Sequence, residues 1–227
     1  MSLSGSTVVV TGASRGIGRA IAVRMAELGA DVALWARDRD ALATVAAEVP
    51  RSRAFVVDVT DPAAIATARD AVRAEMPPVH VLVNNAGAVL RKPTAEISDA
   101  EWRRVMAVNA DGTFYVTRAF IPDLLRTEGR IINIASRAGR EGTPLLAAYC
   151  AAKHAVVGFT RALAEELRAG KVSVNAICPG SVDTQMLREG LPDASPAMTP
   201  DDIGRTVQFL ALHAPRALTG TCIDVFG

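Results

Sequence analysis

The sequence predicts an α/β fold: a single doubly wound domain with a seven-stranded, mostly parallel sheet and helices on both faces. Short apolar runs alternate with longer stretches of helical period along the whole 227-residue chain. Most of these runs are continuous rather than alternating, which indicates strands buried on both faces. No linker, repeat or low-complexity segment interrupts the chain, so one domain is expected over residues 1–227.

The expected strands are short runs rich in β-branched and aliphatic residues. In chain order they are Thr7–Val10, Val32–Ala36, Phe55–Val57, Val79–Val83, Ile131–Ile134, Val172–Ile177 and Cys222–Val225. In a doubly wound sheet the binding crevice lies at the carboxyl ends of the strands. Residues that directly follow these runs are therefore the first candidates for a functional site.

The expected helices carry start and stop signals. Apolar residues recur at helical spacing over residues 17–28, and Gly29 then closes the helix. Asp61 and Pro62 fit an N-cap and a first helical residue, and Ser98 with Glu101 forms a capping box. The other helical segments are Arg39–Glu48, a long helix over residues 99–126, Ala148–Arg168, and a helix that opens at Thr199-Pro200.

The composition excludes several classes of function. With 25 basic and 24 acidic side chains the net charge is +1, and the basic residues are scattered, so no nucleic-acid or anionic-membrane partner is expected. Aromatic residues make up only 4%, too few for stacking on single-stranded nucleic acid. No window approaches the roughly 18 unbroken apolar residues of a membrane span.

The cysteines and histidines point to no metal site. Cys150, Cys178 and Cys222 are odd in number and far apart, and the three histidines lack metal-ligand spacing. Such cysteine usage, with no secretion signal at the N-terminus, favours a reducing compartment and a cytoplasmic location.

A glycine-rich loop links the first expected strand to the first helix. Gly12, Gly16 and Gly18 stand in the stretch Thr11–Gly18, spaced GxxxGxG rather than GxGxxG. Glycine allows positive φ and close approach of a ligand to the backbone, and the following helix N-terminus suits a phosphate. This context favours a dinucleotide site.

A second group of residues suggests proton transfer. Tyr149 and Lys153 are four positions apart on an expected helix, so they share one face. A neighbouring ammonium is expected to lower the tyrosine pKa from about 10. Ser136 ends the fifth strand, where its hydroxyl could hydrogen-bond a substrate oxygen. The only other tyrosine, Tyr115, lies on the expected long helix and is expected to have a packing role.

Together, these motifs resemble the short-chain dehydrogenase/reductase family, and within it the NADP-preferring type similar to 3-oxoacyl-acyl-carrier-protein reductases. The resemblance covers essentially the whole chain. Besides the glycine loop and Tyr149-x-x-x-Lys153, it rests on Asp58-Val59, Asn84–Gly87, Asn109, Ser136 and Pro179-Gly180, in the family's order. It implies a Rossmann domain and an oxidoreductase that transfers a hydride between NADP(H) and a carbonyl or secondary alcohol.

The resemblance also implies roles for individual residues. Tyr149 would be the general acid/base, Lys153 would lower its pKa and contact the nicotinamide ribose, Ser136 would position the oxygen, and Asn109 would hold a proton relay. Asp58 would accept from the adenine amino group. The expected cofactor-binding set is Gly12, Ser14, Arg15, Gly16, Ile17, Gly18, Arg37, Asp58, Val59, Asn85, Ala86, Gly87, Tyr149, Lys153, Pro179, Gly180, Val182 and Thr184.

The preference for NADP(H) rests on two arginines. Where enzymes that use NAD place an acid after the second strand, this chain has Ala36 followed by Arg37. A guanidinium grips a 2′-phosphate, and Arg15 in the glycine loop is a second cation. The alternative is that Arg37 only pairs with Asp38 or Asp40 at the surface.

Two other functions stay open: an NAD-dependent enzyme of the same family, and a non-catalytic nucleotide-binding regulator on the same fold. The expected partner is a small-molecule carbonyl or alcohol of unknown identity. The long helices over 99–126 and Ala148–Arg168 resemble the family's dimer and tetramer faces, so a homo-oligomer is expected, either a homotetramer or a dimer. A lid segment over residues 184–198 is short, which is expected to leave the cleft open.

Overall fold

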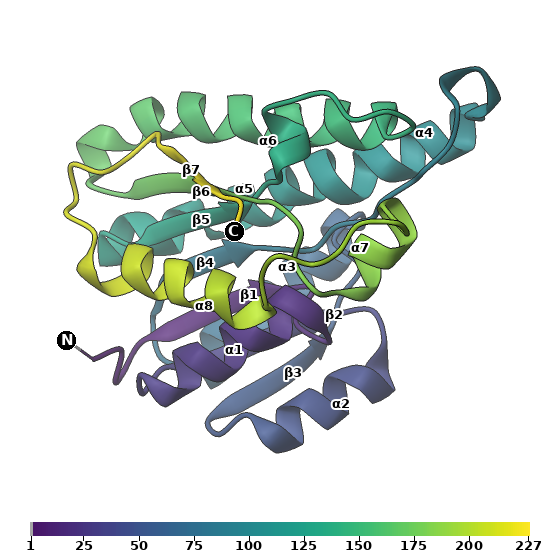
Figure 1. The fold of residues 1–227 in the computed structure, drawn as a ribbon. Helices are drawn as coiled ribbons and strands as arrows, with labels where there is room; N and C mark the ends of the chain where they lie inside the picture. The colour runs from purple at the N-terminus through teal and green to yellow at the C-terminus, as the bar shows by residue number, and fades with distance from the viewer. Residues whose placement is uncertain (1) are drawn as a thin grey trace.

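A computed structural model describes residues 2–227, which form one seven-stranded sheet between layers of helices (Figure 1). The strands are β1 (Thr7–Thr11), β2 (Asp31–Ala36), β3 (Ser52–Val56), β4 (Val79–Asn84), β5 (Arg130–Ile134), β6 (Ser173–Pro179) and β7 (Cys222–Val225). Their order is β3-β2-β1-β4-β5-β6-β7, and every neighbouring pair is parallel. The predicted α/β fold is confirmed, and the sheet is wholly rather than mostly parallel.

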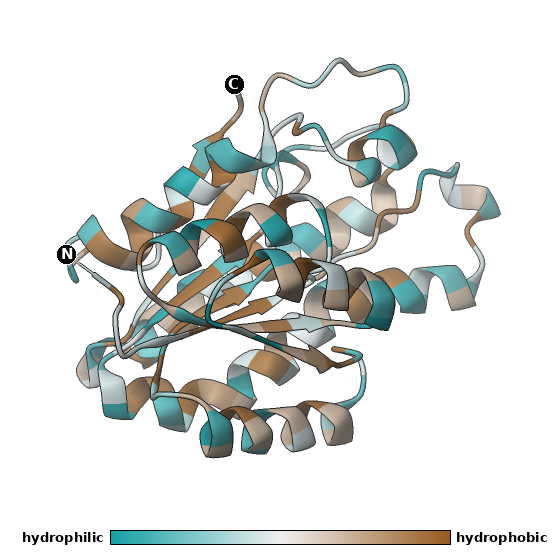
Figure 2. Ribbon diagram, turned by 90° about the horizontal axis from the view of Figure 1, so that it is seen from below, coloured by the Kyte–Doolittle hydropathy of each residue, from teal (hydrophilic) through white to brown (hydrophobic). Residues whose placement is uncertain are grey.

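The helices cover both faces of the sheet. They are α1 (Gly16–Glu27), α2 (Arg39–Glu48), α3 (Pro62–Glu75), α4 (Asp99–Met106), α5 (Gly112–Thr127), α6 (Ala147–Glu166), α7 (Gln185–Gly190) and α8 (Pro200–Gln208). One apolar core holds buried residues of α1, α2 and α8, and the opposite core holds those of α3, α5 and α6. Figure 2 shows the mostly apolar strands between helices that carry both polar and apolar residues.

Burial on both faces explains why the strands read as continuous apolar runs. In β1, Val8 and Val10 belong to the core under α1 and α8, whereas Val9 belongs to the opposite core, and all three are fully buried. In that opposite core Trp35 packs on Phe120, with ring centroids 5.5 Å apart. None of the described helices is long and apolar enough to cross a membrane.

The predicted third and sixth strands differ from the observed ones. The third strand is Ser52–Val56 rather than Phe55–Val57. It is an edge strand that pairs with β2 alone, so it does not need a continuous apolar run. The sixth strand is Ser173–Pro179 rather than Val172–Ile177, and its last residue, Pro179, pairs with Val225.

The predicted long helix over 99–126 is wrong in one respect. A π-helical turn, η2 (Ala107–Asp111), separates α4 from α5. The predicted caps are confirmed: Asp61 accepts from two N–H groups of α3, and Ser98 and Glu101 form the reciprocal capping box of α4. The sequence therefore marks where helices begin more clearly than where their hydrogen-bond pattern changes.

Replacing Gly18 tests how closely α1 packs on the glycine loop. A Cβ on Gly18 would lie 2.2 Å from the carbonyl oxygen of Gly12. We expect Gly18→Ala to lower the free energy of unfolding by about 1–3 kcal/mol, because the glycine loop and α1 would have to move apart. Urea denaturation measures this change.

Gly204→Ala in α8 is the matched control, because its Cβ would lie 3.6 Å from the nearest atom, an ordinary contact. It is expected to raise the free energy of unfolding by about 0.5–1 kcal/mol. Equal effects of the two substitutions would contradict the packing argument.

Candidate active site

The four predicted catalytic residues meet at the carboxyl edge of the sheet. Ser136 follows β5, Tyr149 and Lys153 lie on α6, and Asn109 lies in η2 between α4 and α5. The helix α7 lies beyond the same edge (Figure 1). Parallel strands bring their carboxyl ends together, so segments distant in sequence form one site.

The ammonium of Lys153 anchors α6 to the sheet. Its residue is only 4% exposed, and Nζ donates to the carbonyl oxygen of Ile134 at 2.9 Å. A short 3₁₀ turn, η3 (Arg137–Gly139), packs on the same helix, where a Cβ on Gly139 would lie 2.7 Å from the Lys153 carbonyl oxygen. Burial lowers the pKa of Lys153 from its ordinary 10.5 to about 8.

The hydroxyl of Tyr149 is buried and remains protonated at neutral pH. The residue is 8% exposed, and burial raises its pKa to about 12, although a hydrogen bond with Ser136 acts in the opposite direction. The predicted lowering of this pKa by Lys153 is therefore wrong for the protein alone. The Lys153 ammonium lies 5.7 Å from the centre of the tyrosine ring and is hydrogen-bonded to the sheet instead.

The side chain of Asn109 joins η2 to the loop after β4. Its Nδ2 donates to the carbonyl oxygens of Ala88 and Val105, both at 2.8 Å, and its Oδ1 accepts from Ala88 N–H at 3.3 Å. The residue is fully buried. A Cβ on Gly87 would lie 2.9 Å from Asn109 Oδ1 and 3.6 Å from Lys153 Nζ. The two polar atoms thus border the same small space.

The glycine loop is tied to the end of β4 by Thr11 and Asn85. The Thr11 hydroxyl accepts from the N–H groups of Asn85 and Ala86, at 2.9 and 3.0 Å. The Asn85 side chain donates to the carbonyl oxygens of Thr11 and Gly12. Sequence reasoning assigned Thr11 no contact; its place at the carboxyl end of β1, beside β4, is the signal that could have identified it.

This loop fits a dinucleotide phosphate. Gly12 and Gly16 have φ of 65° and 54°, and a Cβ on Gly12 would lie 2.9 Å from the Cα of Ala86, so the loop is a cradle that side chains would fill. No side chain caps α1, and its first turn holds no acid. Its N–H groups therefore have no competing side-chain anion. Ser14 and Ile17 are half-buried in the same turn.

The two arginines predicted for cofactor selection are exposed and weakly held. Arg37 lies 3.9 Å from Asp58 with its side chain 69% exposed, and Asp38 instead caps α2. Arg15 donates to the Gln185 side chain of α7 at 2.8 Å. The alternative pairing of Arg37 with Asp38 or Asp40 is not observed.

Asp58 lies in the loop between β3 and α3, and its carboxyl stays ionised. Burial raises the pKa of its carboxyl, but the hydrogen bonds from Thr60 and the Arg37 guanidinium outweigh burial and lower it. The neighbouring Val59 is 7% exposed and packs against Gly112 of α5. An ionised acceptor at this place suits an amino group.

The segment after β6 is fixed by the C-terminal residues. Gly180 N–H donates to the Val225 carbonyl oxygen at 2.8 Å, and a Cβ on Gly180 would lie 3.0 Å from Phe226. Sequence reasoning missed Phe226, over whose ring the Arg137 guanidinium also lies. Val182 is 3% exposed, and Thr184 caps α7. The predicted positions thus lie on one ordered segment.

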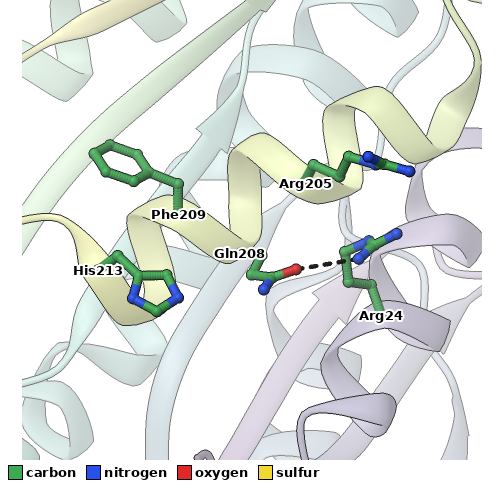
Figure 3. Close-up of a pocket in the computed structure, with 5 residues that line it drawn as sticks. All are labelled: Arg24, Arg205, Gln208, Phe209 and His213. Atoms are coloured by element: carbon green, nitrogen blue, oxygen red, sulfur yellow. Dashed lines mark hydrogen bonds between the residues drawn. The ribbon is translucent and has the colours of Figure 1, made fainter. Parts of the chain in front are cut away.

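Two surface hollows lie outside this cluster. One, of about 360 Å³, lies between α1 and α8 and is lined by Arg24, Arg205, Gln208, Phe209 and His213 (Figure 3). The other, of about 420 Å³, lies beside β3. Neither contains a predicted site residue. Among the described residues no group of three or more His, Cys, Asp or Glu side chains could hold a metal ion.

The comparisons with known proteins decide the family. The family model of short chain dehydrogenases matches residues 6–194. The chain belongs to the short-chain dehydrogenase family.

Relatives of this short-chain dehydrogenase are similar over nearly their whole length. It is 35% identical to a meso-2,3-butanediol dehydrogenase of Serratia marcescens, over 100% of this chain and 95% of that one. The structure superposes on a 3-ketoacyl-(acyl-carrier-protein) reductase from Brucella melitensis complexed with NADH, with a TM-score of 0.94 and 31% identity, covering 100% and 98% of the two chains. It also matches a single-residue variant of an actinorhodin polyketide ketoreductase with NADPH, with a TM-score of 0.92, 34% identity and the same coverage. The resemblance inferred from the motifs is confirmed.

The buried ammonium makes stability depend on pH in a defined direction. The pKa of Lys153 is lower in the folded than in the unfolded protein, so the charged form opposes folding, and this cost disappears as pH rises from about 8 towards 10.5. At about 1.4 kcal/mol per pKa unit, the gain reaches up to about 3 kcal/mol. Denaturant unfolding at pH 7 and pH 10 measures this effect. From pH 7 to pH 10 the free energy of unfolding of the wild type should rise relative to that of Lys153→Met. A difference that stays constant, or that moves in favour of Lys153→Met at pH 10, would contradict the burial argument.

Proposed function

We propose that this short-chain dehydrogenase transfers a hydride between NADP(H) and a small-molecule carbonyl or secondary alcohol. The observation that carries the proposal is the meeting of Ser136, Tyr149, Lys153 and Asn109 at one edge of the sheet. The nicotinamide, when bound, supplies the hydride chemistry. The protein would orient the reactants and transfer the proton.

In the proposed reaction, Tyr149 donates the proton to the substrate oxygen. Ser136 lies near enough to Tyr149 to lower the pKa of that hydroxyl, so one substrate oxygen could accept from both hydroxyls. Because the pKa of Tyr149 is about 12, its proton is present at neutral pH and can be donated to a developing alkoxide. The Lys153 ammonium would stabilise the phenolate left behind.

Asn109 keeps the role that the family resemblance implies, which is to hold the relay that returns a proton towards Lys153. Its Oδ1 and the Lys153 Nζ border the same space beside Gly87. The complete set of Ser136, Tyr149, Lys153 and Asn109 at one edge of the sheet argues against a non-catalytic nucleotide-binding protein, which would not need these groups.

The cofactor would lie along the carboxyl edge from β3 to β6. The N-terminus of α1 would take the pyrophosphate, and Asp58 with Val59 would hold the adenine. Tyr149 and Lys153 would contact the nicotinamide ribose. The remaining contacts would come from the glycine loop (Gly12, Ser14, Arg15, Gly16, Ile17, Gly18), from Asn85, Ala86 and Gly87, and from Pro179, Gly180, Val182 and Thr184.

The preference for NADP(H) over NAD(H) rests on charge at the end of β2. Ala36 stands there in place of an acid, and Arg37 is exposed enough to turn towards a 2′-phosphate. The solved relatives bind either NADPH or NADH, so the choice for this chain depends on its own arginines.

We also propose a cytoplasmic homo-oligomer, a dimer or tetramer, that associates through α5 and α6. Phe114 on α5 is 41% exposed and packs edge-on against Phe159 of α6, with ring centroids 6.1 Å apart. Tyr115 packs beside Phe114, and the Arg118 guanidinium lies over the rings of both residues. An exposed aromatic cluster of this kind is typical of a protein interface.

Replacement of the catalytic tyrosine tests the proposal. Tyr149→Phe is expected to reduce kcat for NADPH-dependent ketone reduction roughly 10²- to 10⁴-fold, because the proton donor is lost. The Kd for NADPH should stay nearly unchanged. Tyr115→Phe alters the only other tyrosine and should keep wild-type activity. Turnover by Tyr149→Phe at the wild-type rate would exclude Tyr149 as the acid.

A second test addresses the cofactor. Arg37→Ala is expected to weaken NADPH binding roughly ten-fold, since one charged hydrogen-bonding partner of the phosphate is lost, and to leave NADH binding unchanged. Fluorescence titration with both cofactors measures the ratio. Arg53→Ala, which removes an exposed arginine paired with Glu75, is the control. Tighter wild-type binding of NADH than of NADPH would favour the NAD-dependent alternative.

A further inference from the structure

The side chain of Met186 lies against the hydroxyl of Tyr149. Tyr149 Oη donates to Met186 Sδ at 3.9 Å. Met186 also packs on the apolar cluster that contains Tyr149, Ala138 and Leu146. The short lid segment was expected to leave the cleft open, but Tyr149 is only 8% exposed. The proton donor is thus covered by a residue of the lid.

Met186 also reaches the space that Lys153 and Asn109 border. A Cβ on Gly87 would lie 3.7 Å from the Met186 methyl carbon, 3.6 Å from Lys153 Nζ and 2.9 Å from Asn109 Oδ1. The thioether therefore lies among the groups proposed to act on the substrate oxygen. A substrate carbonyl must accept the hydrogen bond that the sulfur now accepts.

The helix that carries Met186 is held at both ends. At its start Gln185 accepts from Arg15, and a Cβ on Gly16 would lie 3.3 Å from the Thr184 methyl. At its end a Cβ on Gly190 would lie 3.0 Å from Val89. Because α7 contacts both the glycine loop and the loop after β4, Met186 in its first turn is held against Tyr149.

We propose that Met186 is a specificity-determining residue that sets how bulky a group can flank the substrate carbonyl. This inference rests on the proposed function, since it concerns the same site. The thioether gives way to the substrate oxygen, and the rest of the side chain forms the wall beside the carbonyl carbon. Substrates with a small flanking group fit under it, and bulky ones do not.

A methionine is suited to this position. Its sulfur is a weak acceptor, so a contact at 3.9 Å is lost at little cost when a carbonyl oxygen replaces it. Its side chain has three rotatable bonds and adapts to the shape of its neighbour. It therefore covers Tyr149 without competing strongly with a substrate.

The first experiment measures how well Met186 covers Tyr149, and it needs no turnover. N-Acetylimidazole transfers its acetyl group to an accessible tyrosine oxygen and releases imidazole. Tyr115 and Tyr149 are the only tyrosines, so peptide mass spectrometry separates their rates. Tyr149 in Met186→Ala is expected to react several-fold faster than in the wild type, with Tyr115 unchanged. Met186→Leu, which keeps most of the bulk, should react like the wild type.

The second experiment measures size selection. We expect Met186→Ala to raise kcat/KM for a bulky aryl ketone relative to a small aliphatic ketone roughly ten-fold, the effect of a few carbon-sized groups in a pocket. Leu187→Ala is the matched control, because it shortens the next side chain of α7, which lies outside the cluster around Tyr149. It should keep the wild-type ratio.

The outcomes separate the two proposals. If Met186→Ala leaves the Tyr149 acetylation rate unchanged, or if Leu187→Ala shifts the ketone ratio as much as Met186→Ala does, Met186 does not determine specificity. If Tyr149 is uncovered only in Met186→Ala but the wild type reduces no ketone with NADPH, the proposed function fails while the position of Met186 over Tyr149 is upheld.

Discussion

The hydrogen bond from Lys153 to the backbone of Ile134 determines how the candidate site is assembled. It fixes α6 to the end of β5 at 2.9 Å, two residues before Ser136 in sequence. Tyr149 lies one helical turn earlier on the same face and is thereby brought to the serine. Gly139 allows this approach, because any side chain there would meet the Lys153 carbonyl at 2.7 Å. One buried contact thus aligns helix, strand and turn.

The sequence predicts this alignment only in part. A wholly parallel sheet brings its strand ends to one edge, so motif order alone places Ser136 near Tyr149. Spacing shows that Lys153 shares a helix face with Tyr149, but it does not show how deeply either is buried. Burial depends on side chains from α4 and α7, which pack around Tyr149 from distant parts of the chain. For that reason the direction of the tyrosine pKa shift could not be predicted.

The position of Asn109 shows a second limit. Residue pattern predicts a helix over 99–126, and helical residues do occupy it, but the hydrogen-bond register changes at η2. Such a change depends on what the side chain can reach. Asn109 bonds with both backbone groups of Ala88, an arrangement that requires the loop after β4 to be in place first. A local pattern cannot contain this information. π-Helical turns are frequent at functional sites, and η2 carries Asn109.

Charged side chains of this chain are held with very different strengths, and one of them, Arg15, contacts the lid segment. Arg73 and Arg126 bind a buried Asp123, an arrangement that is costly to break. Arg15, by contrast, is exposed and its partner is the neutral amide of Gln185, so the contact is cheap to exchange for a phosphate. Because Gln185 directly precedes Met186, the contact from Arg15 lies beside the residue that covers the tyrosine. The placing of individual arginines, rather than the net charge of +1, therefore distinguishes the buried ion pair from the exposed contact beside the lid.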